Sequence, residues 1–329
     1  MDVAAARTLI MTRSTLEARG LSSRRIAAAV DAGQLVHVHR GAYVDGAEWA
    51  SLYSEARHLV KVVAVHDRRR GATAVCALSS AAVLHELPLF RLEPKRVHQF
   101  GGQADGHVRS GDRHVARHRI DVPDDDIEIV DGIACTNLAR TVADFIRSAP
   151  EPAGISAADA AMRRIAWHEG ERTYDLAAAE EFRDAVTDRI AAAGRGRGVR
   201  RARKLLVIAD GRAQLPGESV SRLHLLELGF ATPRLQVPIP GPNGCWYHVD
   251  FGLDDVDAWG EFDGKGKYSS SEMLGDATPE EALLAEKQRE DWIRGTTNRR
   301  FPRWGMEHIG TPFALAERLA TFHVHAPQG

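Results

Sequence analysis

The sequence predicts a multidomain α/β protein. At 329 residues the chain exceeds the usual size of a single domain, so we expect two or three domains. The first 46 residues contain three short helix patterns followed by two strand patterns, and a later hairpin pattern lies between two longer helices. A hydrophobic content of 44% is sufficient for real cores.

Composition narrows the classes of function. A net charge of -2 does not indicate a nucleic-acid binder, so any DNA surface must come from local segregation of the 43 Lys and Arg residues. The three cysteines, Cys76, Cys135 and Cys245, show no spacing typical of zinc or of a disulfide framework. Without an apolar leader or an apolar run of ~18 residues, we expect a cytoplasmic protein with no membrane partner.

Residues 1–46 predict a winged helix-turn-helix. Helices are expected over 2–9, from Thr12 to Gly20 and from Ser22 to Gly33, followed by strands over 35–39 and 42–44. In that geometry the start of the third helix enters the major groove of double-stranded DNA. A solvated helical cap is the alternative, but arginines concentrate at the helix start and at the wing. The expected DNA contacts are Ser23, Arg24, Arg25 and Arg40.

This block resembles the N-terminal domain of the AbiEi family, the antitoxins of abortive-infection type IV systems. The resemblance is carried by Gly-Leu-Ser-Ser-Arg-Arg at 20–25, Gly-Gln-Leu-Val at 33–36 and Arg-Gly-Ala-Tyr at 40–43, and it continues through 78–82, His85 and 137–144. It implies DNA binding and leaves a cognate toxin protein open as a partner. Antitoxin activity is not carried over, because this chain ends in a different domain.

Residues 47–150 predict an AbiEi-like mixed α/β middle domain in which we expect no chemistry. Helices are expected near 51–69 and 79–85, strands near 96–100, 114–119, 128–130 and 133–135, and then a helix capped by Thr136. Its histidines have no carboxylate at a matching offset for a metal site, and its Ser-Ser pair lacks the tight elbow of a nucleophile. The residues concerned are His107, His114, His118, Ser79, Ser80 and His85.

Residues 151–205 predict a helical connector with a basic run. Helices are expected near 156–167 and 176–193, followed by a glycine-spaced basic stretch over 194–204. Arg197, Arg200 and Arg201 would follow a phosphate backbone in a salt-dependent manner. A linker followed by the exposed face of a helix is an equally good interpretation.

Residues 248–267 predict a hairpin that gathers carboxylates. A turn centred on 255–256 places Asp250 opposite Glu261 on one face, with Asp263 two residues further on, while Phe251 and Phe262 can pack on a core. Carboxylates placed together repel one another unless a cation lies between them. The pattern therefore indicates a divalent-metal site, with a solvated acidic hairpin as the alternative.

Helices are predicted on both sides of this hairpin. Before it, residues 215–229 place Pro216 near the first helical position, Glu218 in the first turn and Gly229 past the end. After it, a capping box at 278–281 opens a helix that should stop at Gly295, followed by a last strand near 300–306.

This order of elements resembles the restriction-endonuclease-like PD-(D/E)xK superfamily, in its branch related to very-short-patch-repair endonucleases. The motifs are Pro-Gly-Glu-Ser at 216–219, Val-Asp-Phe at 249–251, Glu-Phe-Asp-Gly at 261–264, the stretch 286–291 and Pro-Arg-Trp at 302–304. The resemblance covers about residues 200–310. We therefore expect a nuclease-like domain over 206–310 and a C-terminal helix and tail over 311–329.

The resemblance implies that Asp250 and Glu261 bind Mg²⁺ or Mn²⁺ and that Glu218 orients a metal-bound water. Asp263 stands where the superfamily has lysine, so the positive charge would come from Lys265, Lys267 or Lys287. Two functions are weighed first, with a protein-binding antitoxin that acts on a toxin kinase or nucleotidyltransferase as a third possibility. One is a metal-dependent endonuclease that hydrolyses DNA in phage defence or repair. The other is an AbiEi-like regulator whose nuclease fold is inactive.

Overall fold

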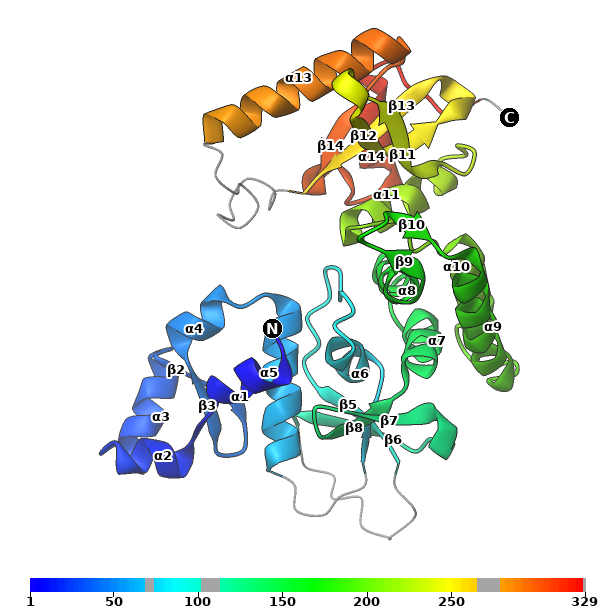
Figure 1. Ribbon diagram of the computed structural model, residues 1–329. Coiled ribbons are helices and arrows are strands. Elements are labelled where there is room, and N and C mark those ends of the chain that lie inside the picture. The colour runs from blue at the N-terminus through cyan, green and yellow to red at the C-terminus, as the bar shows by residue number, and fades with distance from the viewer. Residues whose placement is uncertain (69–73, 102–112, 265–278, 328–329) are drawn as a thin grey trace. The chain divides into compact units, whose positions relative to one another are not determined.

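The computed structural model describes residues 1–68, 74–101, 113–264 and 279–327 (Figure 1). The chain is mixed α/β, as predicted, and divides into two compact units. The first consists of Met1–Ala157 and Glu180–Val207, and the second of Ala158–Ala179 and Ile208–Gly329. The chain therefore changes unit within α8 (Glu151–Ala166), within α9 (Leu176–Ala192) and within α10 (Val199–Ile208). The connector expected over 151–205 is divided between the two units.

The N-terminal block of the first unit contains the predicted helices and ribbon. Its elements are α1 (Val3–Thr8), β1 (Met11–Thr12), α2 (Arg13–Ala18), α3 (Ser23–Asp31), β2 (Leu35–His39) and β3 (Ala42–Asp45). The Thr12 and Ser22 hydroxyls accept from backbone N–H groups in the first turns of α2 and α3, as expected of N-caps. Leu16, Ile26 and Leu35 form the core. Strand β1, which was not predicted, pairs with β3.

The rest of the first unit is built around a five-stranded sheet of order β6-β5-β4-β8-β7. Its elements are α4 (Gly46–Ser51), α5 (Ser54–Asp67), β4 (Val75–Cys76), α6 (Ser79–Leu84), β5 (Val97–Phe100), β6 (Val115–His118), β7 (Ile127–Val130), β8 (Ile133–Thr136) and α7 (Leu138–Ser148). The prediction that Thr136 caps α7 was wrong. Asn137 caps it by accepting from the Arg140 N–H, because Thr136 still belongs to β8 and its buried hydroxyl bonds to Thr141.

The second unit contains a four-stranded sheet of order β11-β12-β13-β14, in which only the β13–β14 pairing is parallel. Its elements are the hairpin β9 (Trp167–His168) and β10 (Thr173–Tyr174), α11 (Pro216–Glu227), β11 (Arg234–Pro240), β12 (Trp246–Leu253), β13 (Ala258–Asp263), α13 (Pro279–Thr297), β14 (Arg303–Gly305) and α14 (Pro312–Ala320). Phe251 lies opposite Gly260, which is the register that the expected turn centre requires.

Helices α11 and α13 pack on opposite faces of this sheet. Gly217 of α11 faces the Phe262 ring, whereas Ile293 of α13 packs with Trp259. Residues 259 and 262 point to opposite faces because side chains alternate along a strand. Arg222 of α11 forms a buried ion pair with Asp159. The Asp159 carboxylate also accepts a hydrogen bond from the Asp210 N–H.

The prediction that Gly295 ends the downstream helix was wrong. Helix α13 continues to Thr297, and Asn298 follows it in the left-handed conformation with φ 53°. A single interior glycine costs a helix only about 1 kcal/mol. The last turn is held by burial of Ile293 and by a 2.8 Å hydrogen bond that the Trp259 indole donates to Thr297. The capping residue expected at 278 lies outside the described residues.

Candidate functional site

Three carboxylates from three elements lie buried in the second unit. Glu218 in the first turn of α11 is 1% exposed, Asp250 of β12 is 7% exposed and Glu261 of β13 is 5% exposed. Pro216 at the start of α11 and the missing side chain of Gly217 allow the helix to begin directly against β13. The prediction that the hairpin brings Asp250 and Glu261 together on one face agrees with the observed register.

Gln236 of β11 joins two of these carboxylates. Its amide nitrogen lies 3.4 Å from Glu218 Oε2 and 3.3 Å from Asp250 Oδ1, while its amide oxygen accepts from Gln214. Gln236 has φ 49°, a conformation that a non-glycine residue adopts only where its surroundings enforce it. Sequence reasoning missed Gln236, because no pattern in the chain indicates a positive φ inside a strand.

Arg289 of α13 pairs with the third carboxylate. Its guanidinium lies 3.1 Å and 3.2 Å from the two oxygens of Glu261 and also donates to the His248 carbonyl. Burial raises the pKa of Glu261 to about 7; Arg289 opposes this rise and the neighbouring Asp250 adds to it. Burial therefore outweighs Arg289 in setting the pKa of Glu261.

Asp263, which stands where the resemblance would lead us to expect a lysine, pairs with an arginine. Asp263 forms a two-point ion pair with Arg303 of β14, at 2.7 Å and 3.2 Å. Glu286 of α13 accepts from both Arg303 and Arg289 and so connects the two pairs. Among the described residues, the cations that contact these carboxylates are thus arginines. Lys287 is exposed, and Lys265 and Lys267 lie outside the described residues.

Further positive charge reaches this site from the start of the second unit. Burial lowers the pKa of Arg163. The charges of Glu169 and Glu218 act in the opposite direction, which shows that Arg163 lies within electrostatic range of Glu218. Burial together with Arg172 and Arg289 lowers the pKa of His248, two residues before Asp250. Arg172 lies between β9 and β10. This hairpin, which sequence reasoning also missed, therefore places a cation within electrostatic range of the carboxylate-bearing strands.

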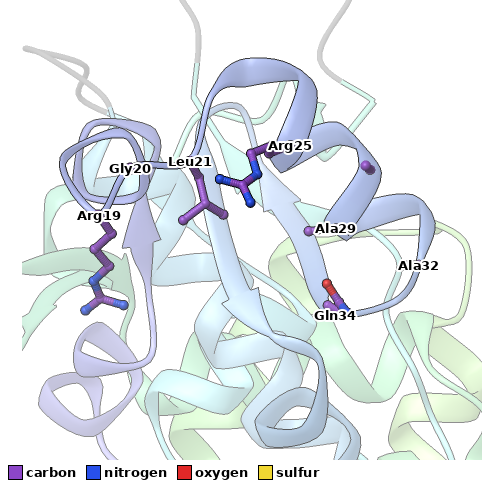
Figure 2. A pocket seen from close by; sticks show the side chains of 8 residues that line it. Arg19, Gly20, Leu21, Arg25, Ala29, Ala32 and Gln34 are labelled. Carbon is purple, nitrogen blue, oxygen red and sulfur yellow. The ribbon is translucent and has the colours of Figure 1, made fainter.

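The start of α3 presents unpaired arginines. Arg24 and Arg25 are exposed and form no ion pair with the part of the chain that the structure describes, whereas the Ser23 hydroxyl accepts from Arg13. Arg25 lines an open hollow of about 500 Å³ beside α3. Figure 2 shows Arg25 extending next to Leu21, with Ala29 and Gln34 further along the hollow. Both guanidinium groups are exposed and can therefore reach an anionic partner.

A second open hollow, of about 740 Å³, lies at the turn between β2 and β3. Four arginines line it and only one acid, Glu17, offsets them, so the surface is basic although the whole chain is not. Arg40 at the expected wing tip is exposed, and Arg68 donates to the carbonyl of neighbouring Gly41. The lining arginines are Arg13, Arg40, Arg68 and Arg117.

The basic run of the connector is partly structural. Arg197 and Arg200 are exposed, whereas Arg201 is half-buried and donates to the Arg147 carbonyl. Residues from 199 onward belong to α10, whose buried positions include Val199 and Ala202. The exposed face of α10 accounts for Arg200, whereas Arg201 is held by the first unit and Arg197 precedes the helix.

A group that could hold a metal lies in the middle segment, where we expected no chemistry. His85 follows α6, Glu128 lies on β7 and Cys135 lies on β8, and one ligand atom from each lies within 4.8 Å of the others. His85 Nε2 is 3.1 Å from a Glu128 oxygen and 3.9 Å from Cys135 Sγ. Burial raises the pKa of Cys135 to about 12, with smaller contributions from Glu128 and Cys76.

Every helix in the described ranges is too short or too polar to cross a membrane. No family model matches the chain. Two proteins of Mycobacterium tuberculosis are similar to it: the uncharacterized protein MT2308 of strain CDC 1551 / Oshkosh and the uncharacterized protein Rv2248 of strain H37Rv. Each is 32% identical over 154 residues, which is 46% of this chain and 51% of the relative. The matched region spans about half the length of these relatives, and neither name states an activity.

Proposed function

We propose that this protein binds double-stranded DNA and hydrolyses its phosphodiester bonds with a divalent cation, Mg²⁺ or Mn²⁺. The observation that carries the proposal is the burial of Glu218 of α11, Asp250 of β12 and Glu261 of β13, with Gln236 hydrogen-bonded to the first two and Asp250 acting on the pKa of the third. Buried carboxylates are costly to a fold unless cations compensate them. Arg289 donates to Glu261 and to Glu286, and the three buried carboxylates supply oxygen ligands of the kind that Mg²⁺ and Mn²⁺ prefer.

Asp250 and Glu261 would hold the cation. When bound, it would lower the pKa of a water and offset charge on a phosphate oxygen. Glu218, with Gln236 hydrogen-bonded to it, would orient that water through a carboxylate that α11 fixes in place. Arg289 fixes the position of Glu261 by donating to that carboxylate and to the backbone of β12.

The N-terminal block would supply the DNA contacts. Arg24 and Arg25 are exposed at the start of α3 and form no ion pair with the described residues, and Arg40 lines the basic hollow at the wing. Arginine binds phosphates and guanine edges because its planar fork donates two parallel hydrogen bonds. A winged helix-turn-helix that delivers a nuclease to duplex DNA accounts for both groups of residues.

A second candidate is a DNA-binding regulator whose nuclease fold does not cleave. The observation that favours it is the contact of Arg289 with both oxygens of Glu261, which leaves that carboxylate already neutralised. The two candidates differ in metal binding. The nuclease takes up Mn²⁺ in calorimetry, and Asp250→Asn abolishes this uptake, whereas the regulator takes up none.

The decisive experiment is cleavage of supercoiled plasmid with Mg²⁺, Mn²⁺ or EDTA. We expect nicking that requires the metal and falls at least about 100-fold in Glu218→Gln and Asp250→Asn, because removing even an outer-shell partner of a metal typically costs 10–100-fold. Asp257→Asn is the matched control. Asp257 lies in the turn of the same hairpin and is 75% exposed, so this variant should cleave normally.

Two results would contradict the proposed nuclease activity. Cleavage that persists in EDTA or in Asp250→Asn would come from a contaminant or from another site. Absence of cleavage by a wild-type protein that still shifts the plasmid in a gel would establish the regulator instead.

A further inference from the structure

We propose that the first unit contains a zinc site formed by Cys76, His85, Glu128 and Cys135. The site is separate from the carboxylates of the second unit, and it does not depend on the proposed nuclease activity. Its ligands come from four elements or their ends: β4, α6, β7 and β8. No spacing pattern in the sequence indicates this site, because its ligands lie far apart along the chain.

The spacing of three of these ligands fits a tetrahedral cation. Zinc bonds of about 2.0–2.3 Å to nitrogen, oxygen and sulfur place neighbouring ligand atoms about 3.3–3.7 Å apart at the tetrahedral angle. In the protein, His85 Nε2 is 3.1 Å from Glu128 Oε1 and 3.9 Å from Cys135 Sγ. These two separations differ from the tetrahedral edges by only a few tenths of an ångström, and the third, between Glu128 and Cys135, is within 4.8 Å.

The fourth ligand follows from the pairing of the strands. Cys76 of β4 is the direct partner of Cys135 in the parallel pairing with β8. Directly paired residues point to the same face of a sheet, and neighbouring strands lie about 4.8 Å apart. Cys76 is 2% exposed and Cys135 is fully buried; Cys76 lies outside the group of ligand atoms that are within 4.8 Å of one another, so its thiol would have to move toward the ion to complete the site.

The donor set selects the kind of metal. Two sulfurs and one imidazole suit zinc, whereas Mg²⁺ and Ca²⁺ prefer oxygen ligands. On binding, the two thiols release their protons to solvent, and the imidazole nitrogen gives up its 2.8 Å hydrogen bond to the Thr136 carbonyl to face the cation. The bound ion would connect α6 to three strands of the sheet.

The test uses the full chain without a histidine tag, loaded with zinc and then dialysed, with its metal content measured by mass spectrometry. Cobalt reconstitution gives a second readout, because thiolate-bound Co²⁺ has a near-ultraviolet charge-transfer band and tetrahedral Co²⁺ has intense visible bands. We expect one zinc per chain and both sets of bands in the wild type. Zinc at 100 times its Kd should also stabilise the fold by about 2.7 kcal/mol.

Matched variants locate the site. Cys135→Ser and His85→Asn should lose zinc and the cobalt bands, and Cys76→Ser should weaken the charge-transfer band. Cys245→Ser removes the exposed thiol of the second unit and should bind like the wild type. A wild type that retains no zinc, or a thiolate band that disappears in Cys245→Ser, would overturn the proposal. Neither of these two results depends on whether the variants at the site fold.

Discussion

Two buried histidines show how strongly the surroundings set the chemistry of a residue. His58 is 1% exposed, and its Nε2 lies 2.9 Å from the Ser80 hydroxyl. Burial lowers its pKa to about 3, with smaller effects from Lys61 and His98. Burial likewise lowers the pKa of His98 to about 4, assisted by His118 and Arg96. Both imidazoles are therefore neutral in the folded protein at pH 7.

These two pKa values predict acid sensitivity of the first unit. Because each folded-state pKa lies below the unfolded value near 6.5, the unfolded chain binds more protons in acid. Stability is therefore complete above pH 6.5 and falls as the pH drops toward 4, by up to about 1.4 kcal/mol per histidine per pH unit. Urea unfolding at pH 7.5, 6 and 5 measures this loss.

His98→Gln should reduce the slope of stability against pH, whereas His66→Gln, at the end of α5, serves as the control and should leave it unchanged. Equal slopes for the wild type and His98→Gln would contradict the assignment.

Residues of the candidate site were predictable only where a local rule fixed them. The turn at 255–256 sets the register that brings Asp250 and Glu261 to one face, and Pro216 sets the start of the helix that carries Glu218. Arg289 could not be chosen over Lys287, because the rotation of α13 about its axis depends on packing of Ile293 across the sheet. Tertiary packing therefore determines that Arg289, and not Lys287, pairs with Glu261.

At the scale of elements, two glycines illustrate opposite roles. A Cβ at Gly217 would lie 2.1 Å from the Phe262 ring, so this position needs glycine for α11 to approach β13. A Cβ at Gly295 would meet nothing within 4 Å, and its helical position is exposed. The first glycine is a packing requirement, and the second only weakens its helix.

We therefore expect Gly217→Ala to destabilise the second unit by about 1–3 kcal/mol through overpacking. Gly295→Ala should stabilise it by up to about 1 kcal/mol, because alanine is the better helix former. Urea unfolding followed by circular dichroism measures both. If Gly217→Ala proves neutral, α11 does not approach β13 as closely as the structure indicates.

The elements that could be predicted were those with clear end signals. Thr12, Ser22 and Pro216 marked helix starts that the structure confirms. Strands β1 and β4 have two residues each, too few for a period to emerge. Strand β11 was missed because Pro238 and Pro240 argue against a strand; it lies at the edge of its sheet, where proline is tolerated.

At the scale of the whole molecule, charge must be segregated for DNA binding, since the net charge is only -2. Replacing Arg24 and Arg25 by Ala should weaken duplex binding and reduce its log-log salt slope by up to about 2, because each phosphate contact contributes about 0.9. Fluorescence anisotropy at several salt concentrations measures this.

The control replaces Lys95 and Arg96, both exposed, by Ala. It removes the same charge from the loop before β5 and should leave the slope unchanged. If both double variants lose affinity equally, net charge governs binding rather than the start of α3.

The division of the chain into two interleaved units has a consequence for biosynthesis. Asp159 leaves the ribosome 63 residues before Arg222, its buried partner, so the second unit cannot close until its C-terminal segment has emerged. The first unit likewise includes Glu180–Val207, which are synthesised after residues 158–179 of the second unit. A gene rearrangement that moved only the region from 206 onward would separate Arg222 from Asp159. Recombination would have to transfer 158–179 together with it.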